Sequence, residues 1–234
     1  MLYLIGLGLD DGEITQKGME ALESAEKAFA EFYTNTETVD VQRLGKKADT
    51  EIEKLSREEV EQKDKIIESA EDQETAFLVS GDPLTATTHY DIKHRAEENG
   101  INTKVIHAPS IFTSIAETGL NVYKFGRTVT LPEDMTPESI GEDIQKNDSI
   151  DLHSLVLLDI NYEASDAAAK LIEINQELSE REVAVLERAN DDGQEISVMN
   201  LRELSNAELG ETPHCIIMIG ETSHKEEEFL EAYR

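Results

Sequence analysis

Residues 76–89 read AFLVSGDPLTATTH, and this stretch decides the fold of the chain. The apolar run AFLV predicts a short buried strand, and the residues after it predict a helix. Gly81, Asp82 and Pro83 therefore lie at the carboxyl end of a strand, which is where open α/β sheets bind ligands. Gly-Asp-Pro is also common in plain turns, so a turn without a ligand is the alternative interpretation.

A second apolar strand is predicted at residues 2–5, and the glycine-containing run GLGL follows it at residues 6–9. Glycines in such a place let a ligand approach the backbone closely. The run differs from the dinucleotide-binding fingerprint, because the third glycine is missing and Asp10 and Asp11 stand where the phosphate-binding helix should open. This argues against a dinucleotide site.

A third short strand is predicted at residues 103–107, and Ala108, Pro109, Ser110 and Ile111 follow it. Proline near the first turn presets a helical φ angle. We expect the free N–H groups of Ser110 and Ile111 to be able to hold a polar ligand. Three strand ends of the first half thus carry loops marked by glycine or proline.

Local patterns predict the other elements. In the first half they are a helix capped by Thr15, a strand at 28–34, a flexible connection at 35–53, a helix opened by the capping box of Ser56 and Glu59 and ending before Gln73, and a helix at 85–99 stopped by Gly100. In the second half they are a strand at 154–160, a helix at 165–178, a strand at 183–186, a turn at 190–194, a helix at 199–209 and a strand at 215–219.

Alternating strands and helices predict an α/β protein with two lobes, residues 1–112 and 113–234, whose strand-end loops converge on one cleft. Residues 132–137, bounded by two prolines, are the candidate for a connection between the lobes or a mobile loop. No repeat of fixed period is present.

The composition is strongly acidic: 51 Asp and Glu against 21 Lys and Arg give a formal charge of −30. This excludes an unassisted nucleic-acid binder, because affinity for phosphates depends on lysine and arginine. The acidic residues are spread along the chain rather than gathered in a tail, so they predict a solvated surface. Such a surface suits a salt-rich cytoplasm, in which salt screens the self-repulsion.

Other classes are excluded by missing signals. Cys215 is the single cysteine, so no disulfide can form within the chain, and a reducing compartment is expected. No signal peptide, membrane span, G-x-S-x-G elbow or phosphate-binding P-loop is found, and the six histidines are scattered without the spacing of a zinc site. We therefore expect a soluble cytoplasmic protein without a metal.

Several runs of the chain, taken together, resemble the diphthine synthases. They are MLYLIGLGL from residue 1, AEFYT from 30, LSRE from 55, GDPLTATTH from 81, HAPSI from 107, TGLNVYKFG from 118, SLVLLDI from 154, ERA from 187 and PHCIIMIG from 213. The resemblance spans the whole chain in order. The ATTH, HAPSI and YKFG runs separate this family from the wider group of proteins with the tetrapyrrole-methylase fold.

The resemblance implies a class III methyltransferase that uses S-adenosylmethionine, bound in a cleft between the lobes. Its substrate would be translation elongation factor 2, on which the amino group of an aminocarboxypropyl-histidine is methylated repeatedly to give diphthine. A homodimer and, with the acidity, a halophilic archaeon are also implied. The implied cofactor contacts are Leu9, Asp82, Thr85, Ser110, Ile111, Leu158, Ala189 and His214.

The chain departs from these relatives at two places. Relatives often have an apolar residue where Thr85 stands, and they carry aromatic residues in the stretch that matches residues 137–142, where this chain has none. No catalytic base is assigned, and Glu31, Tyr33 and His107 are candidates for the substrate side. The alternatives are a methyltransferase of the same fold that acts on a tetrapyrrole or on ribosomal RNA, and a ligand-binding protein without enzymatic activity; the charge disfavours RNA.

Overall fold

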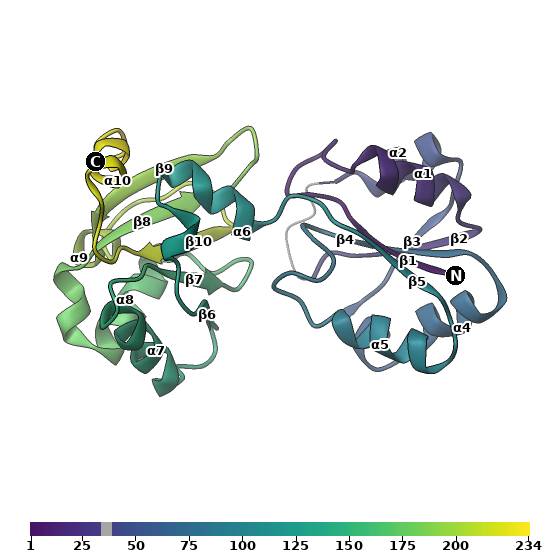
Figure 1. Cartoon of the computed structure of the whole chain (residues 1–234), viewed down its shortest axis with the longest axis horizontal. Coiled ribbons are helices and arrows are strands. Elements are labelled where there is room, and N and C mark those ends of the chain that lie inside the picture. The colour runs from purple at the N-terminus through teal and green to yellow at the C-terminus, as the bar shows by residue number, and fades with distance from the viewer. Residues whose placement is uncertain (34–38) are drawn as a thin grey trace. The chain divides into compact units, whose positions relative to one another are not determined.

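The computed structural model describes residues 1–33 and 39–234, and only the backbone of residue 138. The chain divides into two compact units, Met1–Thr113 and Ser114–Arg234 (Figure 1). The predicted lobes place this boundary one residue earlier. Each unit contains one five-stranded sheet and its own apolar core.

The sheet of the first unit is parallel throughout, with the strand order β3-β2-β4-β1-β5. Its strands are β1 Leu2–Gly6, β2 Lys27–Glu31, β3 Ile52–Lys54, β4 Thr75–Val79 and β5 Thr103–Ile106. The predicted strands at 2–5, 76–79 and 103–107 are confirmed. Strand β1 lies between β4 and β5, so three predicted ligand loops leave the same edge of the sheet from neighbouring strands.

Helices cover both faces of this sheet. They are α1 Gln16–Ser24, α2 Val41–Ala48, α3 Arg57–Glu61, α4 Lys65–Asp72 and α5 Tyr90–Glu98. Helices α1 and α2 lie over one face, and α4 and α5 lie over the other (Figure 1). Side chains of β1 alternate between the two cores: Leu2 and Leu4 pack with α4 and α5, whereas Ile5 packs with α1 and α2. Burial on both faces explains the continuous apolar runs.

The predicted flexible connection at 35–53 is wrong where the structure can be compared with it. Residues 34–38, which include the end of the predicted strand 28–34, lie outside the described residues. Helix α2 and strand β3 occupy most of the remainder. The Asp40 side chain caps α2 by accepting from the N–H groups of Gln42 and Arg43. Val41, Leu44 and Ala48 bury one face of the helix at helical spacing. Polar residues on the opposite face hid this pattern.

The predicted helix at 85–99 begins five residues late, as α5 at Tyr90. The residues before it form a turn, in which Ala86 has a φ of 56°. That left-handed conformation interrupts a helix. The predicted stop at Gly100 is confirmed, since its φ is 75° and its N–H donates to the Glu97 carbonyl.

The sheet of the second unit has the order β6-β7-β10-β8-β9 and is parallel only between β6 and β7. Its strands are β6 Val129–Leu131, β7 Ser154–Leu158, β8 Glu182–Glu187, β9 Glu195–Asn200 and β10 His214–Met218. The helices are α7 Glu138–Asp148, α8 Ala164–Ile174, α9 Leu201–Leu204 and α10 His224–Leu230, with 3-10 turns η1 Ile115–Thr118, η2 Val122–Lys124 and η3 Gln176–Glu180. Short α6, Ile111–Ser114, spans the division between the units.

For this unit, one predicted helix is misplaced, and the predicted connection between the lobes at residues 132–137 is wrong. The predicted helix at 199–209 is shorter and starts later: β9 runs to Asn200, whose side chain caps α9 in a reciprocal pair with Glu203. Residues 132–137 lie within the second unit rather than between the units. The ammonium of Lys170, on α8, donates to three backbone carbonyls of this loop.

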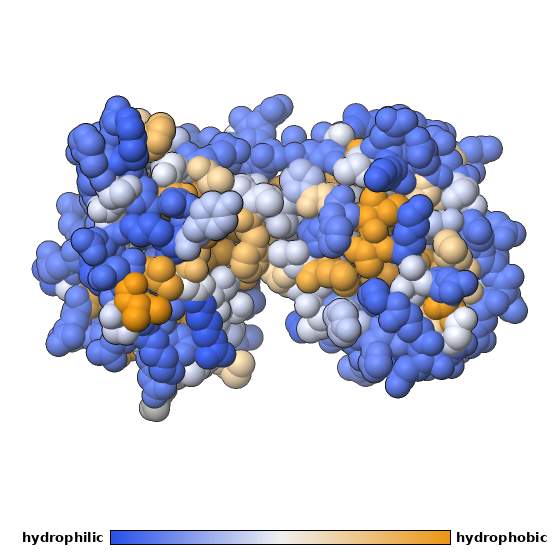
Figure 2. All heavy atoms as spheres, viewed as in Figure 1, coloured by the Kyte–Doolittle hydropathy of each residue, from blue (hydrophilic) through white to orange (hydrophobic). Residues whose placement is uncertain are grey.

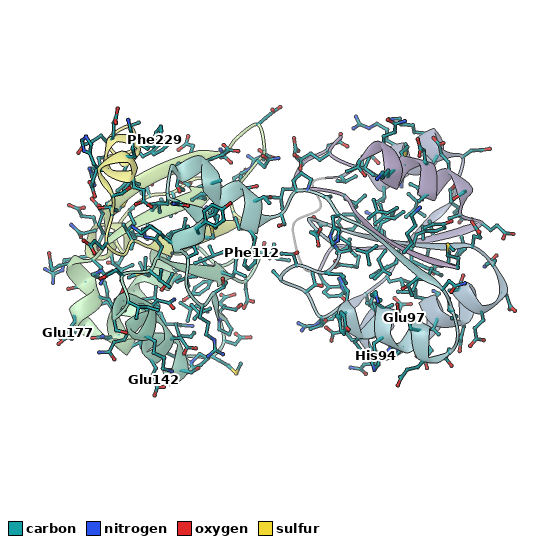
Figure 3. The ribbon with its side chains drawn as sticks, in the orientation of Figure 1. His94, Glu97, Phe112, Glu142, Glu177 and Phe229 are labelled. Carbon is teal, nitrogen blue, oxygen red and sulfur yellow. The ribbon has the colours of Figure 1, made fainter. Side chains whose placement is uncertain are left out.

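Apart from the buried Glu31, Asp82, Asp143, Glu187 and Glu226, the acidic side chains that the structure describes form the predicted solvated surface. Carboxylates project from the helices, for example Glu97 of α5, Glu142 of α7 and Glu177 of η3 (Figure 3). Polar side chains cover most of the visible face of each unit (Figure 2). Within the described residues, no helix combines the length and apolar character needed to cross a membrane.

Candidate functional site

The loops that follow β1, β4 and β5 pack against one another around Gly6. A Cβ atom at Gly6 would lie 2.7 Å from the Cβ of Ala108, 2.7 Å from the Gly81 carbonyl oxygen and 3.0 Å from Cδ of Pro83. Glycine is therefore required for this close approach. Gly8 and Gly81 then pair their backbones, with the Gly81 N–H 2.6 Å from the Gly8 oxygen.

The loop after β1 is closed by Glu13, which the sequence did not single out. Its Oε2 accepts from the N–H of Leu9 at 2.6 Å and from the N–H of Asp10 at 3.1 Å. Leu9 thus presents its side chain and carbonyl, but not its N–H, to a ligand. The sequence signal for this contact is a carboxylate four residues after Leu9, and such a spacing is too common to stand out.

Asp82 is the centre of the site in the first unit, where it is 5% exposed. Its Oδ1 accepts from the Leu84 N–H at 3.1 Å and from the Thr85 hydroxyl at 2.9 Å. Its Oδ2 lies 2.7 Å from Nδ1 of His107 and accepts from the Ala108 N–H at 3.3 Å. Four partners match the roughly four lone-pair positions of a carboxylate.

Burial alone would raise the pKa of the Asp82 carboxyl. Hydrogen bonds from Leu84, His107 and Thr85 outweigh burial and hold this pKa below its usual value. Asp82 is therefore a carboxylate at neutral pH. It orders its own loop, as the turn interpretation holds, and it also joins that loop to the end of β5.

The loop after β5 differs from the expectation of two free N–H groups. The Ser110 N–H donates to the Thr113 hydroxyl at 3.1 Å and is not free. The Ile111 N–H has no acceptor among the residues at 1–33 and 39–234. Only one of the two predicted donors is thus available at the start of α6.

The three candidate residues of the second unit lie at one edge of its sheet. Strands β7 and β8 both run antiparallel to β10, so Leu158 ends β7 beside the start of β10 at His214. Ala189 follows β8, between Arg188 and Asn190, which have φ values of 49° and 68°. The structure thus groups Leu9, Asp82, Thr85, Ser110 and Ile111 in the first unit, and Leu158, Ala189 and His214 in the second.

The His214 imidazole is fully buried and both of its nitrogens are occupied. Nδ1 accepts from the Ala164 N–H at 3.2 Å, so Nε2 carries the proton and donates to the Glu211 carbonyl at 3.1 Å. This ring fixes two loops at the sheet edge. Any direct contact with a ligand is left to the backbone of His214.

A second buried polar group lies beside the Asp82 loop, at the end of β2. The Tyr33 hydroxyl and His89 Nε2 are 3.1 Å apart and share a hydrogen bond, and Glu31 Oε1 lies 3.9 Å from the same nitrogen. His89 also meets the Phe77 ring edge-on. Two of the motifs behind the resemblance, AEFYT and ATTH, are thus in contact, although the sequence pointed to no role for His89.

Burial lowers the pKa of His89 to about 4, against about 6.5 in an unfolded chain. Between these two pKa values the unfolded chain binds a proton at His89, whereas the folded protein does not. The free energy of unfolding therefore keeps its full value above pH 6.5 and decreases as the pH falls toward 4. At pH 5 the loss is about 2 kcal/mol relative to pH 7. We expect His89→Gln to remove this part of the acid sensitivity, measured by urea unfolding at both pH values.

The matched control is His94→Gln, in helix α5, which begins directly after His89; the His94 side chain is exposed (Figure 3). It should keep the acid sensitivity of the wild type. Equal losses between pH 7 and pH 5 in the wild type and the His89 variant would contradict the assignment.

The chain is similar to known proteins in both sequence and structure. Residues 1–205 match the family model described as tetrapyrrole (corrin/porphyrin) methylases. A diphthine synthase of Halorubrum lacusprofundi is 38% identical, covering 98% of this chain and 95% of the relative. The diphthine methyl ester synthase of Homo sapiens is 37% identical, covering 96% and 91%. A crystal structure of a diphthine synthase superposes with a TM-score of 0.94 at 30% identity, covering 99% and 95%.

Proposed function

Because the chain belongs to the diphthine synthases, within the tetrapyrrole methylase family, we propose that it is an S-adenosylmethionine-dependent methyltransferase of diphthamide biosynthesis. Its substrate is the aminocarboxypropyl-histidine of translation elongation factor 2, and it methylates the amino group repeatedly to give diphthine. The observation that carries this proposal is the full-length match to relatives with that name, together with loops at the carboxyl edge of a parallel sheet.

The residues of the first unit suit a cofactor such as S-adenosylmethionine. A Cβ at Gly81 would stand 3.6 Å from the Leu9 side chain and 4.0 Å from the Pro109 carbonyl, with no closer atom. The added atom would be in ordinary van der Waals contact, so the loops after β1, β4 and β5, which carry the five proposed contacts of this unit, meet at Gly81 without a clash. We assign the cofactor to Leu9, Asp82, Thr85, Ser110, Ile111, Leu158, Ala189 and His214.

We propose different roles within this set, and the hydrogen bonds of these residues support them. The hydroxyl of Thr85 and Oδ1 of Asp82 are bonded within their loop, and Oδ2 of Asp82 is bonded to the loop after β5, so they shape the site. The carboxylate of Asp82 favours a bound cation through its charge. Ile111 offers an N–H, and His214 offers its backbone because its ring is occupied.

The cofactor supplies an electrophilic methyl group on a positively charged sulfur. The protein must hold a neutral amine in line with that methyl group. An amine with a pKa of about 7.7 to 8 is roughly 10% neutral near pH 7, so losing its proton costs about 1 to 1.5 kcal/mol in the first round. Aligning two reactants contributes about 7 to 11 kcal/mol in favourable cases, so positioning dominates that round.

The relatives differ in the product that their names state. The protein of Halorubrum lacusprofundi is a diphthine synthase, whereas the human protein is a diphthine methyl ester synthase. We propose diphthine, the trimethylated amine, as the product here. A methyl ester would require a further transfer to a carboxylate oxygen, and the mass of the product peptide distinguishes the two.

The proposed setting is a cytoplasmic homodimer in a salt-rich cell. The resemblance to the family supports the dimer. The formal charge of −30 supports a salt-rich cell, because salt screens the repulsion among surface carboxylates.

The deciding experiment supplies labelled S-adenosylmethionine and elongation factor 2 that carries the aminocarboxypropyl-histidine, at high salt. Transfer of label to that histidine is expected, and unmodified elongation factor 2 is the control. Label on a porphyrinoid but not on the factor would favour the tetrapyrrole alternative. Cofactor binding without transfer to either acceptor would favour a ligand-binding protein.

A further inference from the structure

His107 follows β5 and combines two properties that the other histidines do not share. Its side chain is 71% exposed, yet its Nδ1 is held 2.7 Å from the buried Asp82 carboxylate. The imidazoles of His89, His153 and His214 are buried. His94 and His224 lie on the exposed surfaces of helices α5 and α10.

The environment of His107 fixes which nitrogen carries the proton. Asp82 is a carboxylate and can only accept, so His107 Nδ1 donates to it and Nε2 keeps a free lone pair. Asp82 cannot turn away easily, because the N–H groups of Leu84 and Ala108 and the Thr85 hydroxyl also hold it. Among the described residues, Asp82 is the charged group that contacts His107.

We propose that His107 Nε2 accepts the proton that the substrate amine loses in each round of methylation, and that Asp82 positions His107 for this task. The inference rests on the proposed function. It goes beyond cofactor binding, because it gives the carboxylate at the centre of the site a role in proton transfer.

The proton balance explains the need for an acceptor. The amine lone pair forms a bond to the methyl carbon while the carbon–sulfur bond breaks, and its electron pair stays on sulfur. The product is an ammonium, which must lose a proton before its nitrogen can attack again. His107 takes this proton, the Asp82 carboxylate stabilises the resulting imidazolium, and the exposed ring passes the proton to water.

The final round differs from the earlier ones. After the third transfer the nitrogen is quaternary and carries no proton. His107 therefore matters for the attack of the primary, secondary and tertiary amines, but not for release of the trimethylated product. Loss of His107 should let partly methylated products accumulate.

The test compares wild type with His107→Asn at saturating S-adenosylmethionine, using single-turnover rates on modified elongation factor 2 from pH 6.5 to 9.5. We expect the variant to be about tenfold slower at pH 7, which matches the roughly 10% of the amine that is neutral at that pH. The deficit should shrink as the pH rises, because more of the amine is then neutral in solution. Mono- and dimethylated products should accumulate at pH 7.

Two further variants separate proton transfer from structural effects. Asp82→Asn removes the charged partner of Nδ1 and should give the same pH-dependent deficit. His94→Gln should match the wild type. Affinity for S-adenosylhomocysteine, measured by calorimetry, should be unchanged in His107→Asn.

Each outcome has one interpretation. If His107→Asn is as fast as the wild type, or is slowed equally at every pH, the proton-transfer role is wrong while the proposed function stands. If the wild type itself transfers no methyl group to modified elongation factor 2, the proposed function and this inference both fail.

Discussion

Gly6→Ala is expected to destabilise the first unit by about 2 to 3 kcal/mol, in the range of overpacked cores, and to weaken binding of S-adenosylhomocysteine at least about tenfold. The added methyl group would meet the Cβ of Ala108 and the carbonyl oxygen of Gly81 at 2.7 Å each. The carbonyl belongs to the backbone and cannot rotate aside. The three loops must therefore separate, and the proposed cofactor site separates with them.

Urea unfolding and calorimetry measure the two effects. Gly12→Ala is the control, because Gly12 lies in the turn after β1, with a φ of 96°, and no atom lies within 4 Å of the added methyl group. It should cost about 1 to 2 kcal/mol for the left-handed backbone and leave the affinity unchanged. A Gly6→Ala protein that binds S-adenosylhomocysteine like the wild type would show that these loops do not form the site.

Glu226→Ala is expected to cost about 3 to 5 kcal/mol, the usual result of breaking a buried ion pair. The carboxylate is 3% exposed and accepts from the N–H groups of Asn121 and Ser223 at 2.9 and 2.7 Å. It also lies 3.0 Å from the Lys124 ammonium and 3.2 Å from Nε2 of the buried His153. Its loss leaves the N–H groups of Asn121 and Ser223 and Nε2 of His153 without this acceptor, while the Lys124 ammonium keeps the Glu221 carbonyl, and it removes the carboxylate that joins α10 to η2.

The acid dependence of this effect follows from the pKa of Glu226. Burial would raise this pKa, but hydrogen bonds from Ser223, Asn121, Lys124 and His153 move it well below its usual range. The stabilisation is therefore present above the unfolded pKa and is lost only as the pH falls through the lower folded value. The difference between wild type and Glu226→Ala should persist at pH 5.

Glu228→Ala is the matched control on the same helix. Glu228 is exposed and pairs only with Lys225 among the described residues, so its removal should change the free energy of unfolding by less than about 0.5 kcal/mol. Equal effects of the two substitutions in urea would contradict a structural role for the buried carboxylate.

The buried strands were the predictable part of the fold. Runs such as AFLV in β4 and SLVLL in β7 are apolar on both faces, and few structures other than a buried strand suit so short a run. Strand β9, EISVMN, is half-buried at the edge of its sheet, so its pattern is weak and Met199 was assigned to the following helix. Helix α2 is hard to predict because its buried face consists only of Val41, Leu44, Gly45 and Ala48.

The site could be predicted only in outline. Each strand end pointed to a loop, but the contact between Asp82 and His107 joins loops that are separated by a whole strand and helix. It exists because β1 lies between β4 and β5, with Gly6 small enough for both loops to close over it. No local pattern reveals that order. For the same reason, Tyr33 gave no sign of its bond to His89.

The position of β1 between β4 and β5 has a consequence during synthesis on the ribosome. Leu2 pairs with Thr75 on one side and with Thr103 on the other, so β1 is made before the other strands of its sheet but is the last of them to gain both neighbours. One side of this apolar strand stays unpaired until β5 has left the exit tunnel. Such distant pairings fold slowly. A chaperone that binds short apolar segments would thus find a target in β1 during this interval.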